Sequence, residues 1–255
     1  MPNFGDLIGA FMGNASAPTA QNRMGSALEN LQQQGLGGLG AGGGGMLDGI
    51  LGAVKGGLGS AAQNPAAAGG IGALLGSLVG GGGDSVKGAL GGGALAMLGG
   101  VAMKALMSGG QAEGTNAFSG GAMPLGMKAP ETEDEAQALE QTASLVVKAM
   151  INAAKSDGEI GPKEMQRIVG KLKESGTDDG TQQWVMMEMA KPLDLDAFVA
   201  EIPNTETAAE VYAASLLAIE VDTDAEREYL QQLAQATGLN PMVVQYINQT
   251  MGVKG

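Results

Sequence analysis

The sequence predicts an all-α protein, with a compact C-terminal bundle of about seven helices after a glycine-rich, partly helical or disordered region. Three observations carry this prediction. Apolar residues in 129–255 recur at helical spacing without the alternation typical of strands. Capping residues and prolines mark the helix ends. Glycine is concentrated before residue 129, where 37 of the 45 glycines lie. We therefore expect a low-complexity region at 1–107, a linker at 108–132 and a helical domain at 133–252.

Charge divides the chain at the same place. Residues 129–255 hold 22 acids against nine bases, whereas residues 1–128 hold five of each, so the formal charge of −13 lies in the second part. Nucleic-acid binding is disfavoured, because phosphates repel an acidic domain and the aromatic residues are too few for base stacking. Cysteine and histidine are absent, which removes zinc sites built on them and the familiar nucleophile–base pairs. We predict no enzymatic activity, and any metal should be a hard cation bound through oxygen.

The first long uncharged run covers residues 56–83. Within it Gly72, Gly76 and Gly80 recur every four residues, a spacing that allows close packing of helices in lipid. We predict a membrane-inserting helix at 66–83 and a possible homo-oligomer through this glycine row. The alternative is a flexible Gly/Ala-rich linker that spans nothing.

The second uncharged run covers residues 88–103. Extended to 89–107, it contains one charged residue, Lys104, near one end. A helix of this length spans roughly 28 Å, close to the hydrocarbon thickness of a bilayer. We predict a second membrane-inserting helix here, with the same linker alternative.

Helical stretches follow Pro130, and local signals justify each of them. Side chains that accept backbone N–H groups start helices, proline is favoured at the first helical position, and glycine ends them. The expected helices are 133–156, one from Pro162 to near Gly176, 181–191 before Pro192, 194–201, one capped by Asn204 or Thr205, one from Thr223 to Gly238, and one opened by Asn240-Pro241. About 120 residues of this kind are enough to bury a core.

A helix, an acidic corner and a second helix occur twice, over 147–171 and 212–236. If two such pairs pack about a pseudo-twofold axis, their corners meet at one end. The carboxylates brought together would be Asp157, Glu164, Asp222 and Glu226. Because clustered carboxylates repel each other, they favour a Ca²⁺ or Mg²⁺ ion between them. The alternative is that each acid only caps the following helix or interacts with its N-terminal dipole.

The runs AAKSDGEIGPKE, LDLDAFV, AAEVYAASLLAIEVDTDAEREYL and ATGLNP carry a resemblance to a known group. Over about residues 133–251 the chain resembles the C-terminal domain of the bacterial YebE inner-membrane family, which is similar to the tellurite-resistance protein TerB. The resemblance implies an all-helical domain, bacterial inner-membrane attachment with the domain on the cytoplasmic side, and no established enzymatic activity. It also implies divalent-metal binding at the four carboxylates. The second corner departs from the pattern, being three residues shorter with Thr223 in the glycine's place.

Two functions remain open from the sequence. The first is a non-enzymatic, membrane-associated interaction or scaffold protein that displays an acidic TerB-like domain, modulated by a divalent cation. The second is a soluble Ca²⁺- or Mg²⁺-binding stress-response sensor with a flexible glycine-rich arm. Membrane fractionation separates the two.

Overall fold

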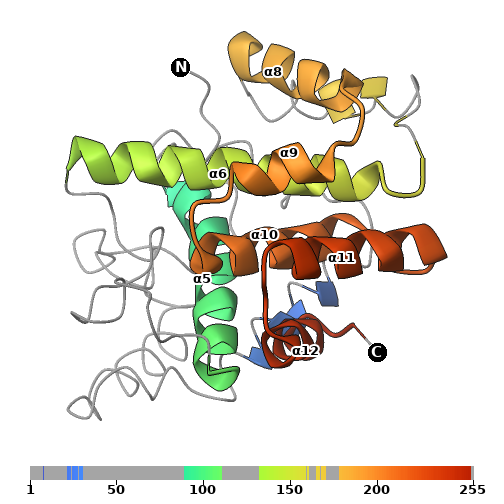
Figure 1. The fold of residues 1–255 in the computed structure, drawn as a ribbon. Helices are drawn as coiled ribbons and strands as arrows, with labels where there is room; N and C mark the ends of the chain where they lie inside the picture. The colour runs from blue at the N-terminus through green and yellow to red at the C-terminus, as the bar shows by residue number, and fades with distance from the viewer. Residues whose placement is uncertain are drawn as a thin grey trace, which may run out of the picture.

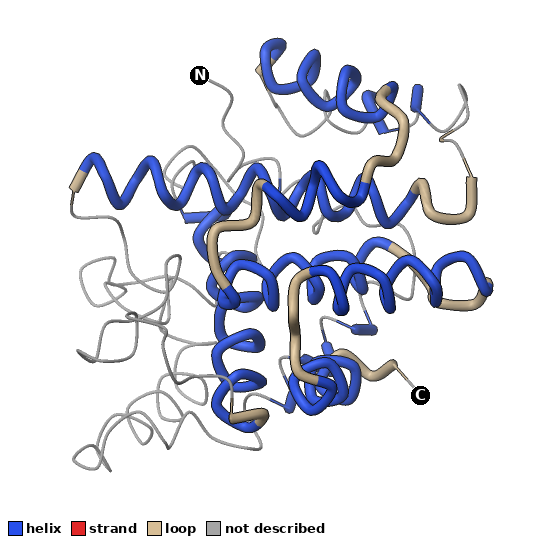
Figure 2. The backbone as a smooth tube through the Cα atoms, viewed as in Figure 1, coloured by secondary structure: helices blue, strands red, loops and turns tan. Residues whose placement is uncertain are grey.

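The computed structural model describes residues 8, 22–23, 25–27, 29–30, 89–110, 132–158, 160, 165–166, 168–170 and 178–253. Its helices are α5 (Ala89–Ser108), α6 (Glu133–Ala154), α8 (Asp179–Ala190), α9 (Leu195–Ala200), α10 (Thr205–Ala218), α11 (Asp224–Ala236) and α12 (Pro241–Thr250) (Figures 1 and 2). No strand occurs among these residues, which confirms the all-α prediction. The predicted membrane helix at 66–83, with its row of Gly72, Gly76 and Gly80, lies outside the described residues.

The helix starts follow the capping signals in the sequence. Each N-cap side chain accepts a backbone N–H from the first turn of its helix, which satisfies a donor that has no partner within the helix. These N-cap residues are Thr132, Asp178, Asp194, Asn204, Thr223 and Asn240. Five of these starts agree with the prediction, whereas α8 begins at Asp179, two residues before the predicted 181. The helix predicted to open at Pro162 and end near Gly176 lies mostly outside the described residues.

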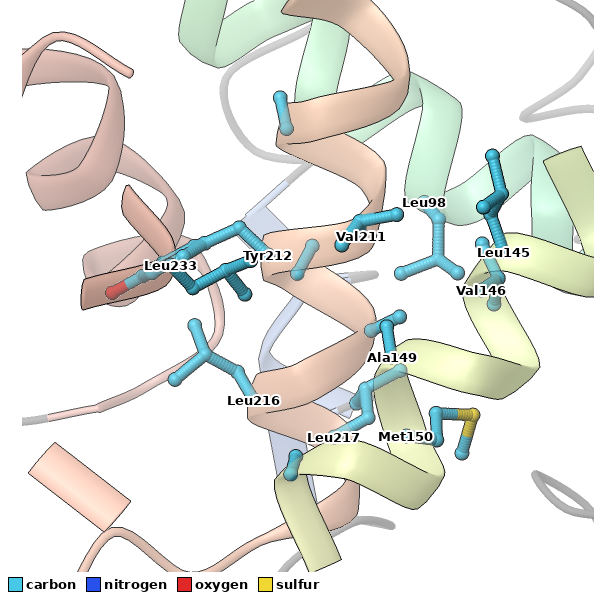
Figure 3. Close-up of a cluster of buried hydrophobic side chains, with 14 of the residues drawn as sticks. Leu98, Leu145, Val146, Ala149, Met150, Val211, Tyr212, Leu216, Leu217 and Leu233 are labelled. Atoms are coloured by element: carbon cyan, nitrogen blue, oxygen red, sulfur yellow. The ribbon is translucent and has the colours of Figure 1, made fainter. Parts of the chain in front are cut away.

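Helix α10 is the centre of the bundle. It packs against α5 and α6 and also contacts α11 and α12, and every residue from 207 to 217 is buried. In Figure 3, Leu217 points toward Met150 of α6, and Tyr212 lies beside Leu233 of α11. A helix buried on all sides needs apolar residues around its whole circumference, as α10 has.

Helix α5 lies in the same hydrophobic core. Leu95, Leu98, Val101 and Leu106 are each at most 1% exposed, and the helix packs against α10 and α12. Within the described part of the chain, no helix combines the length and apolar character needed to cross a membrane. Most side chains described in 95–106, for which the sequence predicted lipid, are buried in the bundle, whereas Met107 is 51% exposed. A fully buried helix and a membrane-spanning helix share the same apolar composition, which is why the pattern did not distinguish them.

The first helices of the two halves of the internal repeat, α6 and α10, lie side by side. Helices α6 and α10 pack together and run in the same direction, so both C-terminal ends lie toward the right in Figure 1. We call residues 155–158 the first corner and residues 219–223 the second corner. As predicted, the two corners occur at the same end of the helix pair.

Candidate functional site

The second corner receives an arginine from a distant part of the chain. Helix α10 has no basic residue in its last turn, and the chain leaves it at Ile219 in an extended conformation. Arg23 fills this place: its Nη1 donates to the carbonyls of Leu216 and Ile219, and its Nη2 donates to Glu220 O at 2.7 Å. We call these three carbonyls the α10 end. The guanidinium satisfies acceptors that have no partner within the helix and meets the negative end of its dipole.

Further contacts hold the N-terminal segment, meaning the described residues between 22 and 30, against the bundle. The Asn30 side-chain amide donates to Thr250 O at 3.2 Å, at the end of α12. At Gly252, where φ is +72°, an added Cβ would lie 3.1 Å from the Ser26 hydroxyl oxygen. Ala27 is fully buried. The segment, blue in Figure 1, therefore lies against the ends of both α10 and α12.

The electrostatics of the second corner suit a bound cation. Arg23 is only 6% exposed; burial lowers its pKa, and the charges of Glu220 and Glu226 oppose that shift. Arginine stays protonated in proteins, so the buried group is a cation. Its charge is balanced by carbonyl dipoles and by the two carboxylates.

A cavity of about 390 Å³ lies between the N-terminal segment and the second corner. Asn22 and Ser26 line it on one side, and Val221 and Met251 contribute to the others. Val221 has φ of +60°, a left-handed conformation that is rare for a β-branched residue and costs about 1–3 kcal/mol. Backbone strain and the bound guanidinium thus occur at the same corner.

Glu226, predicted as a metal ligand, is engaged within its own corner. Its Oε2 accepts from the backbone N–H of Asp222, the backbone N–H of Thr223 and the Thr223 hydroxyl, each at 3.0 Å. The Thr223 hydroxyl in turn accepts from Glu226 N at 3.1 Å, completing a capping box. Burial by itself raises the pKa of Glu226, but the hydrogen bonds from Thr223 and Asp222 bring it below its usual value. This is the capping role that the sequence left as the alternative.

The other predicted ligands are not brought together by the described structure. Asp157 and Asp222 are both exposed, one after α6 and one before α11, and Glu164 lies outside the described residues. Among the residues that are described, no three acids lie close enough to hold a metal ion. The four-carboxylate Ca²⁺ or Mg²⁺ site therefore stays a prediction.

The first corner uses a basic side chain in a related way. Lys155, the C-cap residue of α6, is buried and its Nζ donates to Glu188 O at 2.6 Å and to Lys191 O at 2.8 Å. These carbonyls lie at the end of α8, which also lacks a basic residue in its last turn. Burial lowers the pKa of Lys155, while Glu188 raises it.

Sequence reasoning missed both basic side chains. Each serves a helix that ends without a basic residue, and Arg23 is the single arginine of residues 1–128. Those two signals were available, but they do not say which base binds which helix.

Glu210 is a buried acidic residue that the sequence analysis did not single out. It lies on the central helix α10 and is 3% exposed, and its Oε2 has no hydrogen-bond partner among the described residues. Burial, and then the charge of Glu206 one turn earlier, raises the pKa of Glu210 to about 8. The carboxyl group is therefore largely protonated at neutral pH.

Residues 61–251 match a family described as "Protein of unknown function (DUF533)". The chain belongs to the DUF533 family. The match includes α5 and the helices through α12, begins after the N-terminal segment, and agrees with the TerB-like resemblance. A similar protein is the "Uncharacterized protein in ampR 5'region" of Yersinia enterocolitica, 33% identical over 107 residues, which are 42% of this DUF533 chain and 77% of the relative. No solved structure matches the chain.

Proposed function

We propose that this DUF533 protein is a non-enzymatic interaction protein of the YebE group, which displays an acidic helical bundle from the bacterial inner membrane. The observation that carries the proposal is the buried arginine at the α10 end. The bundle binds a cationic side chain from outside its own helices, through contacts made with backbone carbonyls. Its excess of acids further favours cationic partners through long-range attraction.

Membrane attachment is proposed for residues 66–83. The uncharged run 56–83 supports it, as does the place of α5, whose apolar residues already pack against α10 and α12. An attachment through 66–83 leaves the bundle intact, whereas insertion of α5 would remove core residues such as Leu98. The glycines at 72, 76 and 80 give this segment a surface for association with a second copy.

Carbonate extraction of native membranes tests the proposal. We expect the full chain in the membrane pellet and a Leu75→Lys, Leu78→Lys double variant in the supernatant, because each charge is costly within hydrocarbon. A Met187→Lys control variant, changed at an exposed position of α8, should stay in the pellet. Recovery of the wild-type chain wholly in the supernatant would remove the membrane part of the proposal.

A further inference from the structure

We propose that the α10 end is a binding site for an arginine carried on a helical segment of a partner protein, and that the N-terminal segment occupies this site in cis as an autoinhibitory clasp. The inference rests on the proposed interaction function and names its surface, its partner chemistry and its regulation.

The three carbonyls of the α10 end are arranged to bind one arginine side chain. Three carbonyl oxygens, from Leu216, Ile219 and Glu220, converge on one guanidinium. The planar fork of donors on arginine can reach several acceptors at once, whereas a lysine ammonium is a single point charge. The carboxylates of Glu220 and Glu226 add negative potential around the cation. Recognition here thus selects arginine over lysine by geometry and cations over anions by charge.

The segment that carries the arginine is helical and is anchored beside it. Residues 22–23, 25–27 and 29–30 are in helical conformation, and Asn30 contacts the end of α12 through Thr250 O. The surface therefore accepts a short helix whose arginine and amide lie seven residues apart. A partner helix with this spacing would make the same contacts.

The cis contacts are of a kind that another chain can replace. Arg23 and Asn30 donate to backbone carbonyls of the bundle, so an incoming guanidinium and amide can form the same hydrogen bonds in their place. Fifty-eight residues separate Asn30 from Ala89 in the sequence, so this docking is not dictated by the neighbouring helix along the chain.

The cavity indicates that the cis segment does not fill the surface completely. About 390 Å³ remains beside the small side chains of Asn22 and Ser26. A partner helix with larger apolar residues at these two positions would cover the partly exposed Val221, whereas Met251 is already fully buried. Burial of this apolar surface would favour binding of the partner helix over the N-terminal segment, so the partner would displace the clasp from the α10 end.

A peptide-binding experiment on the full chain tests the proposal. The probe is a fluorescently labelled peptide of residues 18–34, followed by anisotropy against the wild-type chain and the Arg23→Gln chain. We expect the Arg23→Gln chain to bind it at least about ten-fold more tightly, because the cis competitor is lost. The same peptide with Arg23→Gln should bind neither chain. Equal affinity for both chains, or equal binding of both peptides, would overturn the proposal.

Two further variants keep the result decisive. Lys191→Gln removes one positive charge from an exposed side chain at the end of α8, outside the α10 end and its cavity, and should leave the wild-type affinity unchanged. Asn30→Ala loosens the clasp without touching the α10 end; it should give an intermediate affinity and faster tryptic cleavage after Arg23. If Arg23→Gln does not fold, this variant decides, and wild-type affinity with unchanged cleavage contradicts the clasp. Membrane fractionation is independent of these outcomes, so the two proposals fail separately.

Discussion

The two corners of the internal repeat end their helices in different ways. At the first corner, the chain stays in a right-handed helical turn at Lys155, whose backbone N–H bonds back to carbonyls of α6. At the second corner, the chain turns to an extended conformation at Ile219, and Arg23 binds the α10 carbonyls instead. The difference shows how a helix end becomes a binding site. Carbonyls closed by the following turn are unavailable, whereas carbonyls left by an extended exit accept a cation from elsewhere.

The same repeat differs in its interior. When Asp157 is aligned with Asp222, the buried Glu210 of α10 corresponds to the buried Leu145 of α6. One copy thus carries a titratable group where the other carries a hydrocarbon. Helices α6 and α10 therefore differ both at their C-terminal ends and in a buried residue.

The largest expected effect on stability comes from Glu210→Leu, which gives α10 the same buried residue that α6 has at Leu145. The folded-state pKa of Glu210, about 8, lies above the usual 4.5, so the folded protein holds a proton that the unfolded chain has lost between these pH values. Its contribution is fully present below pH 4.5 and is lost as pH rises through about 8, at up to about 1.4 kcal/mol per pH unit. We expect Glu210→Leu to be the more stable chain at pH 8, by a few kcal/mol, because it lacks this pH-dependent loss. Urea unfolding from pH 5 to 9 measures this, and an unchanged pH slope would contradict it.

Next in size is the loss of the cation at the first corner. Lys155→Met removes two charge-assisted hydrogen bonds and leaves the carbonyls of Glu188 and Lys191 without this donor. We expect about 2 kcal/mol of destabilisation, with faster hydrogen exchange in α8. Exchange in the N-terminal segment should be unchanged, since that segment depends on the second corner. Equal acceleration in both places would mean that the two corners do not act separately.

A smaller effect should follow from opening the capping box of the second corner. Thr223→Ala removes the hydroxyl that accepts from Glu226 N and donates to Glu226 Oε2. We expect a loss of about 1 kcal/mol in unfolding free energy. The pKa of Glu226 should rise toward its usual value, since this hydroxyl helps to lower it. Thermal unfolding and carboxyl NMR titration measure the two changes, with Thr237→Ala as a matched hydroxyl control.

The smallest effect concerns divalent cations. Because the Glu226 carboxylate is held by its cap, we expect weak Ca²⁺ or Mg²⁺ binding that depends more on Asp157 than on Asp222. Calorimetry on the full chain, comparing Asp157→Asn with Asp222→Asn, measures the difference. A larger loss from Asp222→Asn would show that the second corner supplies the stronger ligands, and absence of binding heat at millimolar metal would remove the metal prediction.

The helices could be predicted from the sequence because their capping contacts join residues that are close in the chain. Thr223 and Glu226 are three residues apart, and so are Asn204 and Thr207, so each cap is a contact between near neighbours. Such contacts depend on residue type and spacing alone. The all-α class, the helix starts and the alternative role of Glu226 as a cap followed from this.

The sequence by itself thus determined that the described part of the chain is helical and where most of its helices start. Only the tertiary structure decided which other segments pack against each helix. The apolar run of α5 suits lipid and a protein core equally well, and only its packing against α10 and α12 places it in the core. The partner of the α10 end lies about 190 positions away in Arg23. A carbonyl accepts from any nearby donor, so that pairing depends on which segments the folded chain brings together.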